Sequence, residues 1–285
     1  MRKIRKIEEA VFKTITRLAT YSLVVILGYI LFIIFKNGLS SLSWEMISQV
    51  PSGGYYYGGD GGVLNAIIGS LYIALGATII AIIIGVPAAL FINSHLMRSR
   101  RKQNVIRYIL DALWGIPSIV YGAFGFTLMI FLGLSASLLA GILTVSFLIT
   151  PIVIRTFDDV LSTIPRELHE ASLSMGSTQT ETAFKVLFKQ GFSGFITAVL
   201  LAFGRGIGDA ASVLFTAGYT DLLPRNLNEP VATLPLAIFF QLSSPIPEVR
   251  QRAYAAGVIL TVIILIISLT SRFVSNRYKK RTLKF

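Results

Sequence analysis

The sequence predicts an all-α integral membrane protein with six transmembrane helices and both termini in the cytoplasm. Of its 285 residues, 54% are hydrophobic and only 14% are charged, whereas a soluble domain carries about 25% charged residues. The hydrophobic residues form long runs, near the ~20 residues that a helix needs to cross a bilayer. Basic residues lie between these runs and mostly on one side, which predicts the orientation.

Six apolar segments are candidate spans, and together they account for about half of the chain. They cover residues 18–35, 64–92, 108–132, 134–155, 192–218 and 254–274. Pro87 and Pro117 fall inside the second and third spans, where neighbouring helices can satisfy the freed carbonyl groups. Lys36-Asn37 follows the first span in place of a small-residue cleavage site, so we expect this span to be retained rather than removed as a signal peptide.

The distribution of Lys and Arg residues predicts which connectors face the cytoplasm. Twenty-one of them fall in the N-terminal segment, the 93–107 and 155–190 connectors and the C-terminal tail. The opposite side has only four, Lys36, Arg225, Arg250 and Arg252. By the positive-inside rule, this split places both termini in the cytoplasm. The protein is expected to be a multi-pass protein of the plasma membrane. The net charge of +12 therefore reflects topology and does not indicate nucleic acid as a partner.

Two longer segments are expected outside the membrane on the other side. Residues 36–63 contain three consecutive tyrosines and a glycine-rich run, which is typical of a flexible loop at a wet interface. Residues 219–253 contain an apolar stretch, 231–242, that is too short to cross and is expected to be re-entrant or to lie on the surface. For both segments, partner docking and a plain linker remain open.

The longest cytoplasmic connector, residues 155–190, is predicted to contain a short amphipathic helix. Pro165 can open it at the first turn, and Gly176 is a stop signal. The apolar residues between them fall on one stripe, at Ile164, Leu168, Ala171 and Met175. Such a helix can lie along the membrane, pack against the protein's own spans or fit a groove in another subunit. Periodicity alone leaves these three possibilities open.

The same connector resembles the signature loop of ABC importer permeases. The resemblance is carried by Glu170-Ala171-Ser172, by Gly176 after three further residues, and by Val186 ten residues later. Ser172 stands where the family has a second Ala, and Phe188-Lys189 replaces the usual Leu-Pro ending. The resemblance implies that Glu170, Ala171, Ser172 and Gly176 form a coupling loop that docks on a separate ATP-binding cassette ATPase.

The chain is not expected to be an enzyme. It has no Gly-x-x-x-x-Gly-Lys motif for binding nucleotide phosphates. Gly204–Gly208 has the wrong glycine spacing for a nucleotide loop and lies in a span. Cysteine is absent, and His95 and His169 lie far apart, so no metal, cofactor or catalytic site is predicted.

The fifth span contains a charged pair, Arg205 and Asp209. Their i, i+4 spacing puts both side chains on one helical face, and Arg205 is the fourteenth of 27 residues, near the bilayer midplane. An arginine at that depth costs roughly 2.5–3.5 kcal/mol, so it should face the bundle interior or a watery cavity. In one interpretation the pair only neutralises itself, at a helix contact made by Gly204 and Gly208. In the other, Arg205 binds an anionic substrate in the translocation path, and Asp209 orients it.

The region around this pair resembles the permeases of phosphate importers. The similar stretches are residues 201–210 with 214–217, 61–67 and 115–122, and the family usually has Glu where Asp209 stands. The resemblance covers roughly residues 61–275 and is closer to the A-type subunit than to its C-type partner. It implies a six-span type I permease that carries phosphate with a homologous second permease, an ATPase and an extracytoplasmic phosphate-binding protein.

The predicted organisation has three parts: residues 1–60 with the first span and outer loop, a permease core over 61–275 with the coupling loop at 156–190, and a basic tail at 276–285. Permeases for sulfate, molybdate or phosphonate, and the C-type phosphate subunit, remain alternatives. A secondary transporter or channel is a different class, but ionisable residues in the spans are few and no inverted repeat is evident. A membrane scaffold would leave Arg205 unexplained.

Overall fold

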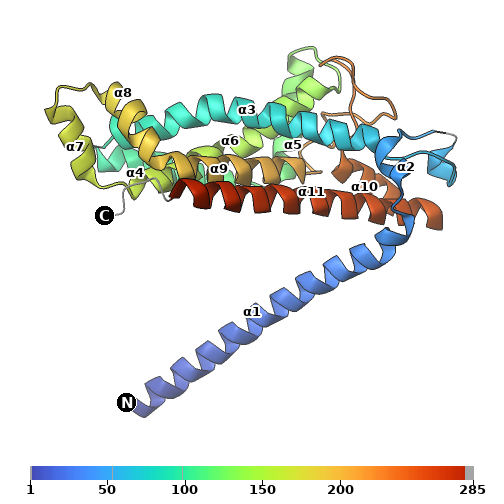
Figure 1. The fold of residues 1–285 in the computed structure, drawn as a ribbon, viewed down its shortest axis with the longest axis horizontal. Coiled ribbons are helices and arrows are strands. Elements are labelled where there is room, and N and C mark those ends of the chain that lie inside the picture. The colour runs from blue at the N-terminus through green and yellow to red at the C-terminus, as the bar shows by residue number, and fades with distance from the viewer. Residues whose placement is uncertain (1, 53, 98, 280–285) are drawn as a thin grey trace.

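The computed structural model describes residues 2–52, 54–97 and 99–279. The regular secondary structure in this part of the chain is helical, apart from one antiparallel bridge between Pro51 and Gly61. Four long helices lie along the long axis of the molecule (Figure 1): α3 (Leu64–Ser94), α6 (Leu138–Ser162), α9 (Phe188–Ile207) and α11 (Pro247–Lys279). The short helices α7 (Arg166–Ser174) and α8 (Gln179–Thr182) lie at one end of this bundle. At the other end lie α2 (Trp44–Ser48) and α10 (Leu234–Leu242). The predicted all-α class is confirmed.

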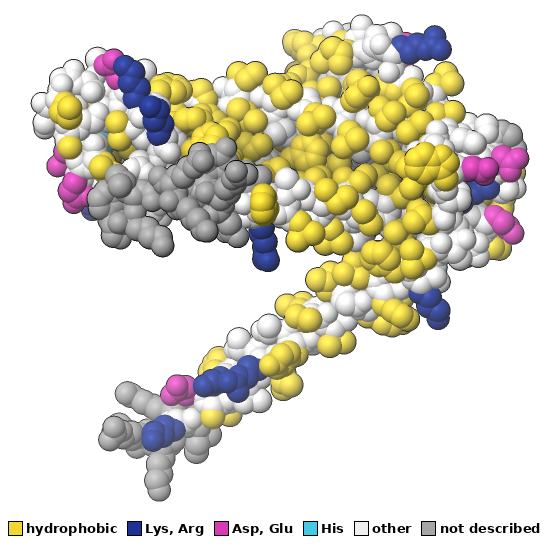
Figure 2. Space-filling view, viewed as in Figure 1, with side chains coloured by type: hydrophobic (Ala, Val, Ile, Leu, Met, Phe, Trp, Pro, Cys, Tyr) yellow, Lys and Arg dark blue, Asp and Glu magenta, His cyan; other side chains and the backbone are white. Residues whose placement is uncertain are grey.

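The first predicted span corresponds to α1 (Arg2–Gly38), which leaves the bundle and projects away from it (Figure 1). None of its apolar window is buried inside the chain, and its hydrophobic side chains are exposed along its length (Figure 2). Only its C-terminal end packs closely, because a Cβ on Gly38 would lie 2.5 Å from the Tyr254 carbonyl oxygen of α11. In a membrane, lipid or another chain must therefore cover most of α1.

The predicted third span, 108–132, is wrong as a single helix. It consists of α4 (Arg100–Trp114) and α5 (Ser118–Phe131), which are bent by 93°. Pro117 causes the break, because it has no N–H to donate and disfavours helical backbone at the residue before it. Within the described residues, five helices can cross a bilayer by length and composition, and the bent pair can provide a sixth span.

The predicted fifth span, 192–218, is wrong at both ends. Its helix begins earlier, because α8 continues through a π-helical turn, Ala183–Leu187, into α9. It also stops at Ile207, and residues 208–233 have no regular helix. Glycines at 204, 206 and 208 weaken the helix here, and the carboxylate of Asp209 accepts a hydrogen bond from the backbone N–H of Ser212, which favours a local turn.

Helix α6 forms the centre of the bundle and packs against α3 and α9. The α3 face that meets it is built from small residues, with Ala77 and Ala81 fully buried. At Gly85 the helices are so close that a Cβ would lie 2.9 Å from a Val153 methyl group. Small residues allow backbones to approach closely, which is how helices associate in a membrane. This contact fixes the frame on which the charged residues are placed.

The two predicted outer segments are folded against the end of the bundle. In residues 36–63, Arg252 donates to the carbonyl oxygens of Gly58 and Gly59, and the Tyr56 hydroxyl donates to Asp221 Oδ1 at 2.5 Å. Burial raises the pKa of Tyr56, and the hydrogen bond to Asp221 adds to that rise. The apolar stretch 231–242 contains α10, whose first turn is completely buried rather than lying on the surface. The glycine-rich chain is therefore held in place by contacts that no local pattern predicts.

Candidate functional site

Arg205 and Asp209 form an ion pair, but the two side chains have different environments. Arg205 lies in the last turn of α9, with its Nη1 3.0 Å from Asp209 Oδ1. The Asp209 side chain is 3% exposed and the Arg205 side chain 46%. The second carboxylate oxygen, Oδ2, accepts from the Ser212 N–H at 2.8 Å. Asp209 is thus held through both oxygens, whereas Arg205 has further N–H donors directed outward.

This pair lies near the middle of the bundle's length. A Cβ on Gly206 would lie 3.2 Å from Val145 and 3.8 Å from Ile149, which are the eighth and twelfth of the 25 residues of α6. The sequence predicted this depth by placing Arg205 halfway along a helix of 27 residues. The structure reaches it differently, because α9 itself ends about halfway along the bundle.

Beyond α9 the chain is irregular and yet buried. Ser212, Val213, Thr216 and Ala217 are at most 1% exposed. Their segment bonds to its neighbours, with Thr216 O accepting from Ser137 N and Ala217 O from Val231 N, both at 2.9 Å. At membrane depth, non-helical backbone is tolerated only where it is buried in protein or lines a water-filled cavity. The pair therefore lies where α9 ends inside the bundle and buried, irregular backbone begins.

The face of α9 that carries Arg205 is not covered by the part of the chain that the structure describes. Thr197, Leu201, Arg205 and Gly208 are exposed at successive turns. The glycine ridge expected to make a helix contact makes none within the described chain at Gly204, where a Cβ would meet nothing within 4 Å. A half-exposed arginine at this depth does not face hydrocarbon cheaply. At Gly208, by contrast, a Cβ would lie 3.7 Å from a methyl group of Ile264 on α11. Helix packing by the pair and substrate contact by Arg205 therefore both stay predictions.

The predicted connector helix is present as α7, preceded by Pro165 and ending before Gly176, whose φ is +87°. Its predicted apolar stripe is divided between two sides. Ile164 and Leu168 are half-buried against the bundle, whereas Met175 is 86% exposed.

The four predicted coupling residues lie together at this end of the molecule. Glu170, Ala171 and Gly176 are exposed. Ser172 is half-buried, and its hydroxyl forms a hydrogen bond of 2.9 Å with the Thr182 hydroxyl of α8. One side of α7 thus packs against the rest of the chain, and its other side is exposed.

Sequence reasoning missed a charged network near the α7 end of the bundle. Asp158 of α6 is completely buried and accepts from Arg107 Nε and Nη2 of α4, at 2.8 Å each. It also accepts from Asn93 Nδ2 of α3 at 2.8 Å and from Arg155 Nη1 at 3.2 Å. Arg155 forms further ion pairs with Asp111 and Asp159. The network therefore fastens three helices together.

One sequence signal could have revealed this network. Arg155, Asp158 and Asp159 have the i, i+3, i+4 spacing of helical ion pairs. The predicted fourth span ends at residue 155, so Asp158 and Asp159 fall in the predicted connector. Arg107 and Arg155 enter the prediction only as charges that set the orientation.

The amino-acid sequence matches a family of transport proteins. A family model described as "Binding-protein-dependent transport system inner membrane component" matches residues 81–283. The chain belongs to this family of permeases. The permease is 34% identical over 247 residues to the phosphate transport system permease protein PstA of Haemophilus influenzae, covering 86% of each chain. It is 30% identical over 268 residues to PstA of Pasteurella multocida, covering 94% of each.

A solved structure shares the fold of this permease. An inward-facing structure of the MetNI methionine ABC transporter matches it with a TM-score of 0.63 at 18% identity, covering 75% of this chain and 95% of that chain. The permease is thus a multi-pass inner-membrane protein with an ABC importer permease fold, and the family predicted from its motifs is confirmed.

Proposed function

We propose that this permease is the A-type membrane subunit of an ATP-driven importer of inorganic phosphate, and that Arg205 contacts the phosphate in the translocation path. The observation that carries the proposal is the half-exposed guanidinium at mid-bundle, oriented by a buried carboxylate. The substrate class is supported by relatives at 30–34% identity that are phosphate transport system permeases.

The chemistry of the pair suits transient binding of an oxyanion. A guanidinium is always charged, and its planar fork donates two parallel hydrogen bonds to a phosphate. Asp209 offsets part of this charge at 3.0 Å, which prevents the anion from being held too tightly. Transport requires binding that is favourable enough to admit the ion and weak enough to release it.

A second permease subunit would complete the path. In the bilayer, lipid or another chain must lie against the exposed face of α9 and the exposed apolar surface of α1. A homologous partner against α9 would enclose Arg205 between two chains and leave the water-filled route that its charge needs.

The segment α7 would transmit the work of a separate ATPase. The charge split of Lys and Arg places this end of the bundle in the cytoplasm. There, Glu170, Ala171 and Met175 are exposed for docking on an ATP-binding cassette subunit. Only Thr163 to Pro165 separate α7 from α6, so a displacement of α7 would move α6 and the helices tied to Asp158. An extracytoplasmic phosphate-binding protein would deliver substrate at the opposite end.

The test is uptake of radiolabelled phosphate by the complete importer in proteoliposomes carrying Arg205→Gln. Uptake is expected to be roughly 100-fold lower with assembly intact, because about 3 kcal/mol of charge-assisted hydrogen bonding is lost. Arg101→Gln, at an exposed position on α4, is the matched control and should leave uptake unchanged.

Two results would count against the proposal. Loss of the assembled complex on Arg205→Gln would assign the arginine to packing between chains, and unchanged uptake would remove it from the path. Competition by excess sulfate, molybdate or phosphonate in the wild-type importer would instead shift the substrate to another oxyanion.

A further inference from the structure

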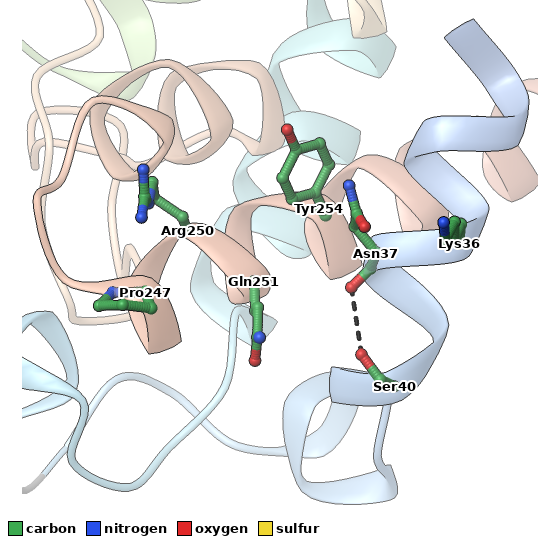
Figure 3. A pocket seen from close by; sticks show the side chains of 7 residues that line it. All are labelled: Lys36, Asn37, Ser40, Pro247, Arg250, Gln251 and Tyr254. Carbon is green, nitrogen blue, oxygen red and sulfur yellow. Dashed lines mark hydrogen bonds between the residues drawn. The ribbon is translucent and has the colours of Figure 1, made fainter. Parts of the chain in front are cut away.

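A second basic site lies where the end of α1 meets the start of α11, at the end of the bundle opposite to α7 (Figures 1 and 3). It is a cavity of about 320 Å³. Seven residues line it, Lys36, Asn37, Ser40, Pro247, Arg250, Gln251 and Tyr254.

The walls of this cavity are fixed by two local features. The four residues from α11 have i, i+3, i+4 and i+7 spacing, so they form one face of its first two turns. The other wall is held against this face at Gly38, which allows α1 to contact the Tyr254 backbone. Ser40 donates its hydroxyl to the Asn37 carbonyl oxygen at 3.2 Å, and Figure 3 shows the Asn37 amide beside Tyr254.

The lining carries two positive charges and no acidic side chain. Among the described residues, neither Lys36 nor Arg250 has a carboxylate within 4 Å. The Lys36 ammonium lies 6.0 Å from the centre of the Phe32 ring, which is the outer limit of a cation–π contact. Around these cations stand hydroxyl and amide groups that can donate hydrogen bonds. This combination suits an anion with several oxygens, such as a phosphate group.

The position of the cavity indicates the source of such an anion. Lys36 directly follows the apolar run 18–35, and Tyr254 begins the apolar run 254–274. Residues that close a hydrophobic span lie at the level of the lipid headgroups, where Tyr and Lys are favoured. The cavity therefore opens at the depth of phospholipid phosphates rather than in the transport path.

We propose that this cavity binds a phosphate-bearing anion, and that its occupant is the phosphodiester headgroup of an anionic phospholipid. The headgroup would bridge Lys36 on α1 and Arg250 on α11, and so fix the angle at which α1 leaves the bundle. The inference is independent of the transported substrate, because the site is separate from Arg205 and would act equally in a permease for another oxyanion.

The test measures lipid retention by the purified importer complex in native mass spectrometry, with phosphatidylglycerol or phosphatidylcholine added. Wild type is expected to retain phosphatidylglycerol preferentially. Lys36→Gln with Arg250→Gln should lower that retention roughly tenfold, since each basic group at a membrane surface adds to the attraction of anionic lipid. Arg225→Gln, another basic residue outside the cavity, is the matched control and should retain lipid as wild type does.

A second arm measures binding of inorganic phosphate to the same complexes without added lipid. Phosphate binding that falls in the double variant while lipid retention is unchanged would identify free phosphate as the occupant and overturn the lipid assignment. No change in either measurement would overturn the site. If the double variant fails to assemble, Lys36→Gln alone, at an exposed position, takes its place, and Lys36→Arg should restore retention.

Discussion

Among the residues that the structure describes, arginine meets a buried aspartate in two places, which differ in how many carboxylate partners each arginine has. At mid-bundle, Asp209 is 3% exposed and pairs with one arginine that is 46% exposed. Near the α7 end, Asp158 is completely buried between Arg107 and Arg155, whose side chains are only 26% and 20% exposed. Both sites use the same pair of functional groups.

The two sites differ in how many contacts their arginines make with carboxylate groups. Arg107 directs two N–H groups at Asp158, and Arg155 is shared among three carboxylates. These contacts, with that of Asn93, join α3, α4 and α6 through Asp158. Arg205 contacts one carboxylate oxygen and has donors left for a ligand. In this protein, the number of carboxylate contacts therefore separates the pair proposed to bind substrate from the network that joins helices.

The largest contrast is expected from removing each aspartate. Asp158→Ala should destabilise the protein by about 3–5 kcal/mol, because it leaves two guanidinium groups in the bundle without their central acceptor. Asp209→Ala should cost about 1–2 kcal/mol, since the half-exposed Arg205 can be solvated. Thermal unfolding followed by size-exclusion chromatography in detergent measures both. Equal losses of stability in the two variants would show that the number of arginine contacts does not distinguish the two sites.

A smaller contrast is expected from exchanging each arginine for lysine. Arg205→Lys keeps the charge but loses the planar fork, so phosphate uptake should fall roughly tenfold with little change in thermal stability. Arg107→Lys loses one of its two bonds to Asp158 and should lower thermal stability, with uptake per folded complex unchanged. Measuring both quantities on both variants separates ligand binding from fastening. Lower stability in Arg205→Lys together with lower uptake in Arg107→Lys would assign substrate contact to Arg107 and helix fastening to Arg205.

The smallest effect is expected at the loop that follows α7. Gly176→Ala places a Cβ at φ +87°, which costs about 1–2 kcal/mol for a residue with a side chain, although nothing lies within 4 Å to clash with it. We expect uptake per ATP hydrolysed to fall several-fold, while the thermal midpoint falls by only a few degrees. Ser174→Ala, two residues earlier and exposed, is the control. Unchanged coupling in Gly176→Ala and in Glu170→Gln would refute docking at this loop.

Four of the predicted spans appear as long helices, namely the first, second, fourth and last. The helix α7 was also predicted with nearly correct ends. These features are local, because run length, a proline at the start and a glycine at the stop act within one or two turns. The third and fifth spans were wrong for a related reason. A hydrophobic run does not show that Pro117 bends it by 93° or that Asp209 ends a helix at Ile207.

The Arg205–Asp209 pair was predictable because its members are four residues apart, and the family was predictable because its motifs are contiguous. The Asp158 network was not, since Asn93, Arg107 and Asp158 are brought together from helices up to 65 residues apart. The same holds for Lys36 and Arg250 at the α1–α11 cavity.

The sequence by itself determined that this is an all-α membrane permease with a charged pair in one of its spans. Hydrophobic run length gives the membrane fold, the i, i+4 spacing gives the pair, and contiguous family motifs give the permease assignment. Only the tertiary structure decided how many carboxylate groups each arginine contacts and how exposed each guanidinium is. The reason is that an arginine's hydrogen-bond partners come from whichever helices pack beside it, and packing between distant segments is not written in any local pattern.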